Sequence, residues 1–296
     1  MFLDSKNAIL HENLGSRILE GKREACELNF CDFDDVRFQL KCDASSTNIV
    51  KLNICSGCYE DVVTMGAKEK LEELFPGFLA EPDEGFDVAL EFDLDTLADG
   101  PAFLNNISNV KKHILGAPIE VAFRNLESGT GGNTEIQSFS YRENEPIFVC
   151  PKPERVVVIM LLKFKDQTDR ALARVFLQEF VEAKRQVTGI FAPNVSYSKG
   201  PPTELIGHPD MPSLNESSGF ILFQFEKKAI SGHAKDTAVH LLTGFRTYIM
   251  YHIKATKTYL HMRMRKRVNG WMQVLNRAKP TVDNGKAKPP APKRNF

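Results

Sequence analysis

The sequence predicts an α+β fold: two similar domains with antiparallel sheets flanked by helices, plus a long C-terminal helix. Alternation of apolar and polar residues, typical of antiparallel strands with one solvated face, marks the strands of the first half, and further strands, one of them strongly apolar at Phe220–Phe225, follow in the second half. The order of helix, strands and helix also occurs twice. A helical pattern without proline then covers residues 236–278. We expect a first domain at 1–117, a second at 118–280 and a disordered basic tail at 281–296.

The first half is expected to begin with an amphipathic helix over residues 1–20, with apolar positions at Phe2, Ile9, Leu14, Ile18 and Leu19. Alternating strands are expected at Leu28–Cys31, Val36–Leu40, Ile49–Ile54 and Phe86–Phe92. A second helix is expected over Tyr59–Phe75, because Pro76 prevents its continuation.

The second half is expected to begin with a helix over Pro118–Leu126, followed by a flexible turn at 128–133. Strands are expected at Ile136–Arg142, Pro146–Cys150, Val156–Phe164, Leu172–Phe180 and Phe220–Phe225. Residues 191–204 contain Pro193, Pro201 and Pro202 and are expected to form a loop.

The long helix carries one apolar stripe, made of Leu241, Phe245, Tyr248, Ile249, Ile253, Tyr259 and Leu260. Steps of three and four residues place these side chains on one helical face. At about 1.5 Å per residue the helix would be roughly 65 Å long, whereas a compact chain of this size has a radius of gyration of about 19 Å. We therefore expect one end of the helix to extend beyond its own domain and its stripe to need a partner.

The same helix is basic. Between Thr237 and Val282 there is no Asp or Glu, and the Lys and Arg residues there are Arg246, Lys254, Lys257, Arg263, Arg265, Lys266, Arg267, Arg277 and Lys279. Arg263 and Arg267 fall on the continuation of the stripe, where a buried unpaired guanidinium would be costly. An acidic or polar partner surface is expected to cover them; a solvated helix end is the alternative.

The formal net charge of zero conceals an asymmetry. Residues 237–296 hold 13 Lys and Arg and one acid, and the remaining residues hold 25 basic and 37 acidic side chains. This division predicts a basic docking region on an acidic body. We expect no membrane span and no signal peptide, and hence a cytoplasmic protein with reduced cysteines.

The strongest candidate for catalysis is the pair Asp32 and Asp34, which resembles the nucleophile loop of aspartate-dependent phosphatases. That chemistry also needs a second acidic pair for magnesium and a parallel sheet, and the sequence favours neither. We expect a polar turn whose carboxylates bond nearby backbone N–H groups.

Metal and cofactor sites are not predicted. Cys55 and Cys58 have zinc or redox spacing, but no matching pair follows them. His240, His252 and His261 on the long helix are too far apart to share one ion. We therefore predict no catalytic residue, no cofactor and no metal.

A family resemblance rests on several segments. The most distinctive are Phe245–Tyr248, Tyr251–Lys254, Tyr259–Arg265 and Val274–Pro280, together with Phe30–Asp34, Val175–Phe180, Pro201–Leu205 and Gly219–Ile221. In these segments the chain resembles the family of the 34-kDa subunit, subunit 2, of the actin-related protein 2/3 complex, which nucleates branched actin filaments. The likeness is most specific over 172–280 and weak over 95–135. Cys31 and Asp35 differ from the residues expected in that family.

The resemblance implies two related α+β domains and a long C-terminal helix that packs against the corresponding helix of subunit 4. It implies a scaffold without enzymatic activity or a cofactor of its own, because nucleotide belongs to the actin-related subunits. The implied partners are subunit 4, actin-related proteins 2 and 3, and the side of an actin filament. The implied location is the cytoplasm, at the actin cytoskeleton.

Two sets of residues follow from this resemblance. The candidate partner-helix interface is Leu241, Phe245, Tyr248, Ile249, Ile253, Tyr259, Leu260, Arg263 and Arg267. The candidate filament-facing basic residues are Lys254, Lys257, Arg265, Lys266, Arg277 and Lys279. The alternative functions are nucleic-acid binding, with Arg263–Arg267 on phosphates, and the phosphatase activity considered above. No nucleic acid is expected as a partner.

Overall fold

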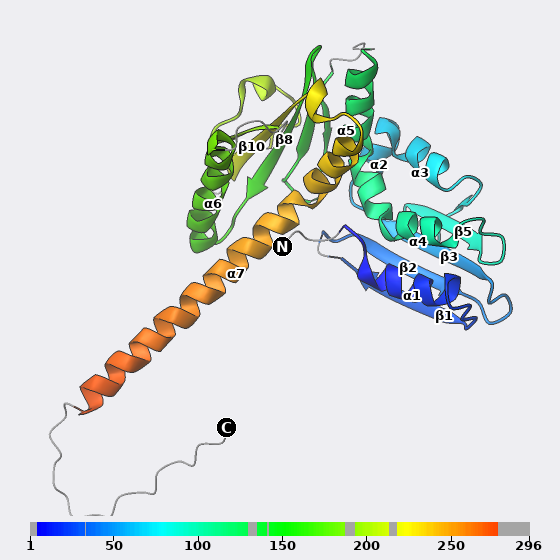
Figure 1. The fold of residues 1–296 in the computed structure, drawn as a ribbon, viewed down its shortest axis with the longest axis horizontal. Helices are drawn as coiled ribbons and strands as arrows, with labels where there is room; N and C mark the ends of the chain where they lie inside the picture. The colour runs from blue at the N-terminus through cyan, green and yellow to red at the C-terminus, as the bar shows by residue number, and fades with distance from the viewer. Residues whose placement is uncertain are drawn as a thin grey trace, which may run out of the picture. The chain divides into compact units, whose positions relative to one another are not determined.

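Two five-stranded antiparallel sheets and the helices around them make up the fold (Figure 1). The computed structural model describes residues 5–32, 34–129, 135–140, 142–186, 193–212 and 218–277. Residues up to Ile253 form one compact unit, and the chain from Lys254 onward forms a second.

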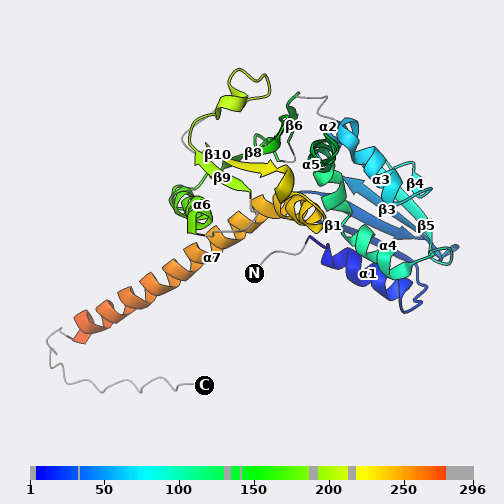
Figure 2. The same cartoon turned by 45° about the horizontal axis from the view of Figure 1, so that its top comes forward.

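The first sheet has the strand order β1-β2-β3-β5-β4. Its strands are β1 Cys26–Cys31, β2 Arg37–Cys42, β3 Ile49–Cys55, β4 Leu79–Ala80 and β5 Val88–Asp93. Helices α1 Ala8–Ile18 and α4 Gly100–Ser108 lie side by side over this sheet (Figure 2). Leu10 and Leu14 of α1 join Leu40 and Leu52 in the core. The four strands expected here are confirmed as strands, and the first helix covers 8–18 of the expected 1–20.

The other face of the first sheet is polar. Asn53 is buried there and donates a hydrogen bond to Gln39 at 3.0 Å, while its side-chain oxygen accepts one from the backbone of Asp83 at 3.1 Å. Lys41 and Lys51 both pair with the Asp83 carboxylate. The loop after β4 is therefore fixed to strands β2 and β3 through Asp83, which pairs with Lys41 of β2 and Lys51 of β3.

The helix expected over Tyr59–Phe75 is broken into α2 Tyr59–Val62, the π-helix η1 Val63–Ala67 and α3 Lys68–Leu74. Gly66 has a φ of +103°, and a Cβ at this position would lie 2.7 Å from Val121 of the facing helix. Only glycine avoids both the backbone strain and this clash. The break therefore lets the chain approach the facing helix closely.

Helix α5, Val110–Ser128, lies between the two sheets. It contacts α2, α3 and η1 on one side and strands β7 and β8 on the other. The expected helix start at Pro118 is wrong, because the helix already begins at Val110 and continues through that proline. The expected boundary at 117 therefore falls within a helix, and the division into domains 1–117 and 118–280 stays a prediction.

The second sheet has the strand order β6-β7-β8-β10-β9. Its strands are β6 Gln137–Phe139, β7 Ile147–Pro151, β8 Arg155–Lys163, β9 Asn194–Ser198 and β10 Ser218–Glu226. Both faces are buried: Val158 and Met160 point into the main core, whereas Ile159 and Leu161 point to a second cluster with Leu205 of the short helix η2, Thr203–Leu205. Strand β9 lies in the segment expected to be a loop. It is an edge strand, where the preceding Pro193 is tolerated.

The expected strand Leu172–Phe180 is wrong, because these residues belong to helix α6, Gln167–Gln186. Leu172, Phe176 and Phe180 recur every four residues and pack against the core together. The carboxylate of Asp166 accepts a hydrogen bond from the Asp169 backbone at 2.9 Å, which caps the start of the helix.

Helix α7, His233–Arg277, follows the short helix η3, Lys227–Ala229. It begins three residues before the expected Asp236, and the expected last residue lies outside the described ranges. Ala238, Val239, Leu242, Phe245, Ile249 and Ile253 are its buried residues. Arg246 forms a two-fold ion pair with Glu145, at 2.9 and 3.2 Å, which ties α7 to the turn before β7.

We predict that Gly116→Ala lowers the free energy of unfolding by about 1–2 kcal/mol, because overpacking costs typically 1–3 kcal/mol. A Cβ at Gly116 would lie 2.4 Å from Cγ1 of Val239, a stiff β-branched residue of α7. Gly244→Ala is the matched control, because nothing lies within 4 Å of a Cβ there. That substitution should raise stability by up to about 1 kcal/mol through helix propensity. Urea unfolding measures both, and equal stabilisation would contradict the close crossing of α5 and α7.

We also predict a loss of stability in acid that depends on His113 of α5. Burial, assisted by Lys112 and Lys70 and opposed by Glu120 and Asp236, lowers the pKa of His113 to about 4. Its Nε2 atom is buried and finds no hydrogen-bond partner in the described part of the chain.

In the unfolded chain His113 has a pKa near 6.5. Between about pH 6.5 and 4, His113 is therefore protonated in the unfolded chain but neutral in the folded chain. The contribution of neutral His113 is therefore complete above about pH 6.5 and is lost as the pH falls toward 4. Between pH 7.5 and 5.0, His113→Leu should lose less stability than the native chain, by up to about 2 kcal/mol. The exposed His261→Leu is the control, and identical pH profiles for all three proteins would refute this assignment.

Candidate functional site

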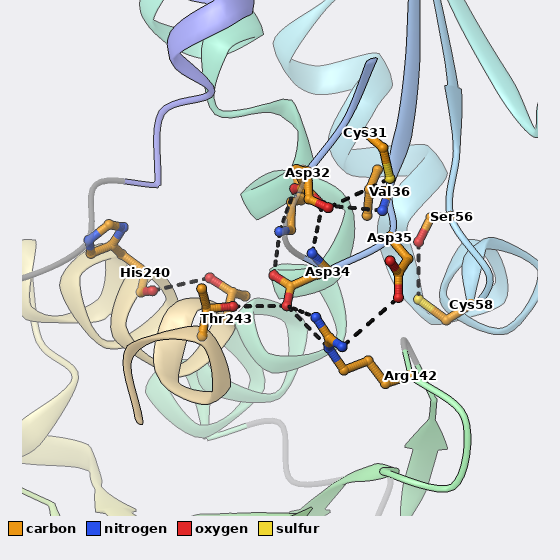
Figure 3. A network of polar contacts seen from close by, with 12 residues as sticks. Cys31, Asp32, Asp34, Asp35, Val36, Ser56, Cys58, Arg142, His240 and Thr243 are labelled. Carbon is orange, nitrogen blue, oxygen red and sulfur yellow. Dashed lines mark hydrogen bonds and ion pairs between the residues drawn. The ribbon is translucent and has the colours of Figure 1, made fainter. Parts of the chain in front are cut away.

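The turn between β1 and β2 holds the two carboxylates that were considered for catalysis. The Asp32 carboxylate accepts hydrogen bonds from the backbone of Asp34 at 2.9 Å and of Val36 at 3.2 Å (Figure 3). This confirms Asp32 as a turn residue. Asp35 has a φ of +61°, in the left-handed region that Asp tolerates better than most residues.

Asp34 does more than form a turn, which corrects the expectation for this residue. Its side chain is 3% exposed and contacts three segments distant in sequence. Lys111 of α5 forms an ion pair with it, Arg142 donates to it at 3.2 Å, and the Thr247 hydroxyl of α7 donates at 2.8 Å. Figure 3 shows the contact between the Asp34 carboxylate and the Arg142 guanidinium. Asp34 therefore joins the first sheet to α5, to the loop before β7 and to α7.

The electrostatics of this cluster are those of a structural ion pair. Burial alone raises the pKa of the Asp34 carboxyl, but Lys111, Thr247 and Arg142 outweigh it and hold the pKa below its ordinary value. Lys111 also lies 2.6 Å from the second oxygen of Asp32, so one ammonium group pairs with both carboxylates, and Arg142 supplies a second positive charge. The strands on either side are antiparallel, whereas the phosphatase chemistry needs a parallel sheet. The geometry therefore does not support the phosphatase hypothesis.

The cysteine pair does not resemble a metal site. Burial raises the pKa of the Cys58 thiol to about 11, and its sulfur lies 3.4 Å from the Ser56 hydroxyl. Cys55 accepts from Arg37 at 3.0 Å. Within the described ranges, no three His, Cys, Asp or Glu side chains are grouped to hold an ion.

The expected partner stripe on α7 divides into two parts. Phe245, Ile249 and Ile253 are buried in the core of this chain, so the expectation that they face a partner is wrong. The physical reason is the second sheet together with α6: Phe245 packs edge-on against Phe180 and Phe223, with ring centroids 5.7 and 4.9 Å away. Tyr248 is half-buried in the same aromatic cluster, and Leu241 is exposed.

The second unit begins at Lys254, and its described part is exposed throughout, with Lys257 and Leu260 only half-covered. Tyr259, Leu260, Arg263 and Arg267 lie here, and their role as a partner surface stays a prediction. So does the filament-facing role of Lys254, Lys257, Arg265, Lys266 and Arg277, whereas Lys279 lies outside the described residues.

We name residues 254–277 the terminal segment. It carries exposed apolar residues that the sequence argument missed. At 3.6 residues per turn, one sector about 120° wide contains Leu260, Met264, Val268, Trp271, Val274 and Leu275. Trp271 is 69% exposed. The spacing of four, four, three and four from Leu260 to Leu275 was a readable signal, but the predicted stripe ended at Leu260.

Charge completes this surface. The terminal segment contains seven Lys and Arg and no Asp or Glu. The Arg263 guanidinium lies 5.6 Å from the centre of the Tyr259 ring. A sector of exposed apolar side chains interspersed with and bordered by one sign of charge is typical of a protein interaction surface. None of the described helices combines the length and apolarity that crossing a bilayer requires.

Comparisons with known proteins agree on one family. The family model described as Arp2/3 complex, 34 kD subunit p34-Arc matches residues 52–282. The chain is 29% identical to actin-related protein 2/3 complex subunit 2 of Schizosaccharomyces pombe, over 95% of both chains. It is 30% identical to subunit 2A of Arabidopsis thaliana, over 95% of this chain and 92% of the relative. It is 31% identical to subunit 2 of Dictyostelium discoideum, over 96% and 95%.

We predict that Asp34→Asn lowers the free energy of unfolding by about 2–3 kcal/mol, because Lys111 and Arg142 lose the charge that compensates their burial. This is below the range for fully buried pairs, since both cations keep some solvent contact. Asp32→Asn should cost about 1 kcal/mol, because its amide oxygen still accepts the two turn hydrogen bonds. Denaturant unfolding compares them. A smaller effect at Asp34 than at Asp32 would contradict the role of Asp34 as the joining residue.

Proposed function

This chain belongs to the family of the 34-kDa subunit, subunit 2, of the Arp2/3 complex, and from that membership we propose that it is a non-catalytic structural subunit that also binds the side of an actin filament. In this proposal it forms the core of the complex with subunit 4 and supports nucleation of branched filaments by actin-related proteins 2 and 3. Its site of action is the cytoplasmic actin cytoskeleton.

The terminal segment is the observation that carries the proposal. It is exposed, lacks acids and places apolar side chains in one sector, so a partner that covers it removes several large apolar groups from water. The apolar sector is assigned to subunit 4. The candidate filament-facing residues outside that sector, Lys254, Arg265, Lys266 and Arg277, are assigned to the filament, whose surface is acidic.

The candidate enzymatic site supports a structural reading. Both carboxylates of the β1–β2 turn are engaged by Lys111, and the chain uses this cluster to connect distant segments. A structural role for Asp32 and Asp34 accounts for two acids lying two residues apart, and no catalytic role is needed to explain them.

We predict that the triple reversal Arg265→Glu, Lys266→Glu and Arg277→Glu weakens filament binding by the reconstituted complex about 5- to 30-fold at low salt. Each exposed pair contributes about 0–1 kcal/mol, so the three changes act together, and salt should reduce the difference. Filament co-sedimentation measures the effect. The matched control reverses Lys22, Lys68 and Lys165, three exposed lysines of the body, with the same change in net charge.

Equal binding by both triple variants and the native complex would mean that the basic residues form only a solvated helix end. A competition arm tests the nucleic-acid alternative. If single-stranded RNA displaces the complex from filaments while the control variant behaves as native, the basic helix has a general polyanion site rather than a site specific for filaments.

A further inference from the structure

Two cysteines face each other across the first two strands of the first sheet. Cys26 begins β1, Cys42 ends β2, and the two are directly opposed in the antiparallel register. Opposed residues project their side chains to the same face of a sheet. On this same face the rings of Phe30 and Phe38, another opposed pair, stack with their centroids 5.2 Å apart. The register therefore brings the two thiols together at the edge of the core.

The backbone spacing at this pair suits a disulfide. The N–H of Asp32 donates to the carbonyl of Val36 at 3.0 Å, so these two residues form a hydrogen-bonded pair beside the turn. Hydrogen-bonded and non-hydrogen-bonded pairs alternate along an antiparallel ladder, and Cys26 and Cys42 lie an even number of steps further on. The Cα atoms of a hydrogen-bonded pair are about 5.5 Å apart, within the range of about 4.4–6.8 Å that disulfides join. A link therefore needs rotation of the side chains rather than movement of a strand.

The two thiols differ in exposure, which sets the order in which they react. Cys26 is half-buried, whereas Cys42 is 4% exposed and its thiol donates to the carbonyl of Thr47 at 3.3 Å. Burial raises the pKa of the Cys26 thiol, Arg17 opposes this rise and the neighbouring Cys42 adds to it. The thiolate is the reactive form, so Cys26 reacts first, and slowly at neutral pH. Cys42 is shielded from solvent and is placed to react with Cys26.

The other cysteines have different surroundings. Cys31 lies opposite Arg37, and the sulfur of Cys55 accepts a hydrogen bond from the same guanidinium. Cys58 is buried at the start of α2, and Cys150 is buried in the second sheet. Cys26 and Cys42 are thus the two thiols that strand pairing holds face to face.

We propose that Cys26 and Cys42 form a modification site for hydroperoxides, at which oxidation links β1 to β2 through a reversible disulfide. The Cys26 thiolate attacks the O–O bond, so an S–O bond forms and the other oxygen leaves as an alcohol, or as water from hydrogen peroxide, after taking a proton. The Cys42 thiol then attacks the Cys26 sulfur, the S–S bond forms, and water leaves with the Cys42 proton. Two electrons pass from the thiols to the peroxide, and a dithiol reductant returns them.

The link would close the β1–β2 hairpin at the end opposite the Asp34 turn. Strand β1 is the edge strand of the first sheet, so β2 is its one neighbour there. The closed loop, Cys26–Cys42, contains the turn with Asp32 and Asp34, which already fixes the other end of the hairpin. Oxidation therefore fixes the register of the edge strand at both ends. This inference goes beyond the proposed function and does not depend on it.

Peptide mapping of the full chain without denaturant tests the site. The chain is treated with hydrogen peroxide at about pH 8, where more of the thiol is ionised, remaining thiols are blocked, and a tryptic digest is analysed without reductant. Cleavage after Arg37 and Lys41 separates the strands, so the link holds two peptides together. We expect this pair at the summed mass less two hydrogens, and its loss with dithiothreitol.

Several results would overturn the proposal: oxygen added to Cys26 beside a free Cys42, a link between Cys55 and Cys58 instead, or no reaction at either strand. The melting temperature of the linked chain should rise by about 3–8 °C, because the link restricts the unfolded chain. A link that lowers the melting temperature would mean that the cysteines join only when the sheet is distorted, which also contradicts a site built into the fold.

Matched variants identify the two cysteines. Cys31→Ser removes an exposed cysteine from the same strand and the same tryptic peptide, and the link should form unchanged. Cys26→Ser should leave Cys42 as a free thiol. Because Cys42 lies in the core, its removal is tested as Cys42→Ala, which keeps the site apolar; Cys26 should then stop at the sulfenic acid, which dimedone traps. Circular dichroism checks that each variant is folded. Oxidation of Cys42 at the native rate in Cys26→Ser would show that it does not react through Cys26 and would overturn the assignment.

Discussion

The buried carboxylate of Asp34 is the interaction that connects the two sheets with the long helix. A carboxylate that leaves water without compensation costs several kcal/mol, so the partners of Asp34 have to be in place when the turn is buried. Those partners come from α5, from the loop before β7 and from α7. The first sheet, α5, the loop before β7 and the first half of α7 are therefore linked through this one side chain, alongside the Arg246–Glu145 pair and the crossing of α5 and α7 at Gly116.

Helix α7 has two parts with different surroundings, a buried part in the core and an exposed basic part. Up to Ile253 the helix is a core element: it packs on the second sheet, pairs with Glu145 through Arg246 and crosses α5 at Gly116. From Lys254 onward its side chains face water and no acid interrupts the basic series. A helix holds side chains at fixed angular steps, so an exposed helical sector offers a more exact binding geometry than a loop of the same composition.

Much of this architecture could be predicted from the sequence, and the failures have physical reasons. The strands of the first sheet were recognised because one face of that sheet is polar, which makes alternation visible. Strands β8 and β10 of the second sheet are buried on both faces and show as continuous apolar runs instead. Helix α6 was mistaken for a strand, although the four-residue spacing of Leu172, Phe176 and Phe180 and the cap at Asp166 were present. The role of Asp34 could not be predicted, because its partners Arg142 and Thr247 lie 108 and 213 residues away.

The sequence also could not show where the α7 stripe divides, since an apolar residue looks the same in a sequence whether its own sheet or another chain covers it. The structure is needed to tell which apolar residues of α7 are buried within the chain. Leu242 and Ile249 are covered within the chain, whereas Met264, Trp271 and Leu275 are not. Exposed apolar groups on a neutral helix would promote self-association. The terminal segment carries positive charge and no acid, so it repels identical copies and attracts an acidic partner. The Lys and Arg side chains beside the apolar sector therefore restrict which proteins can cover it.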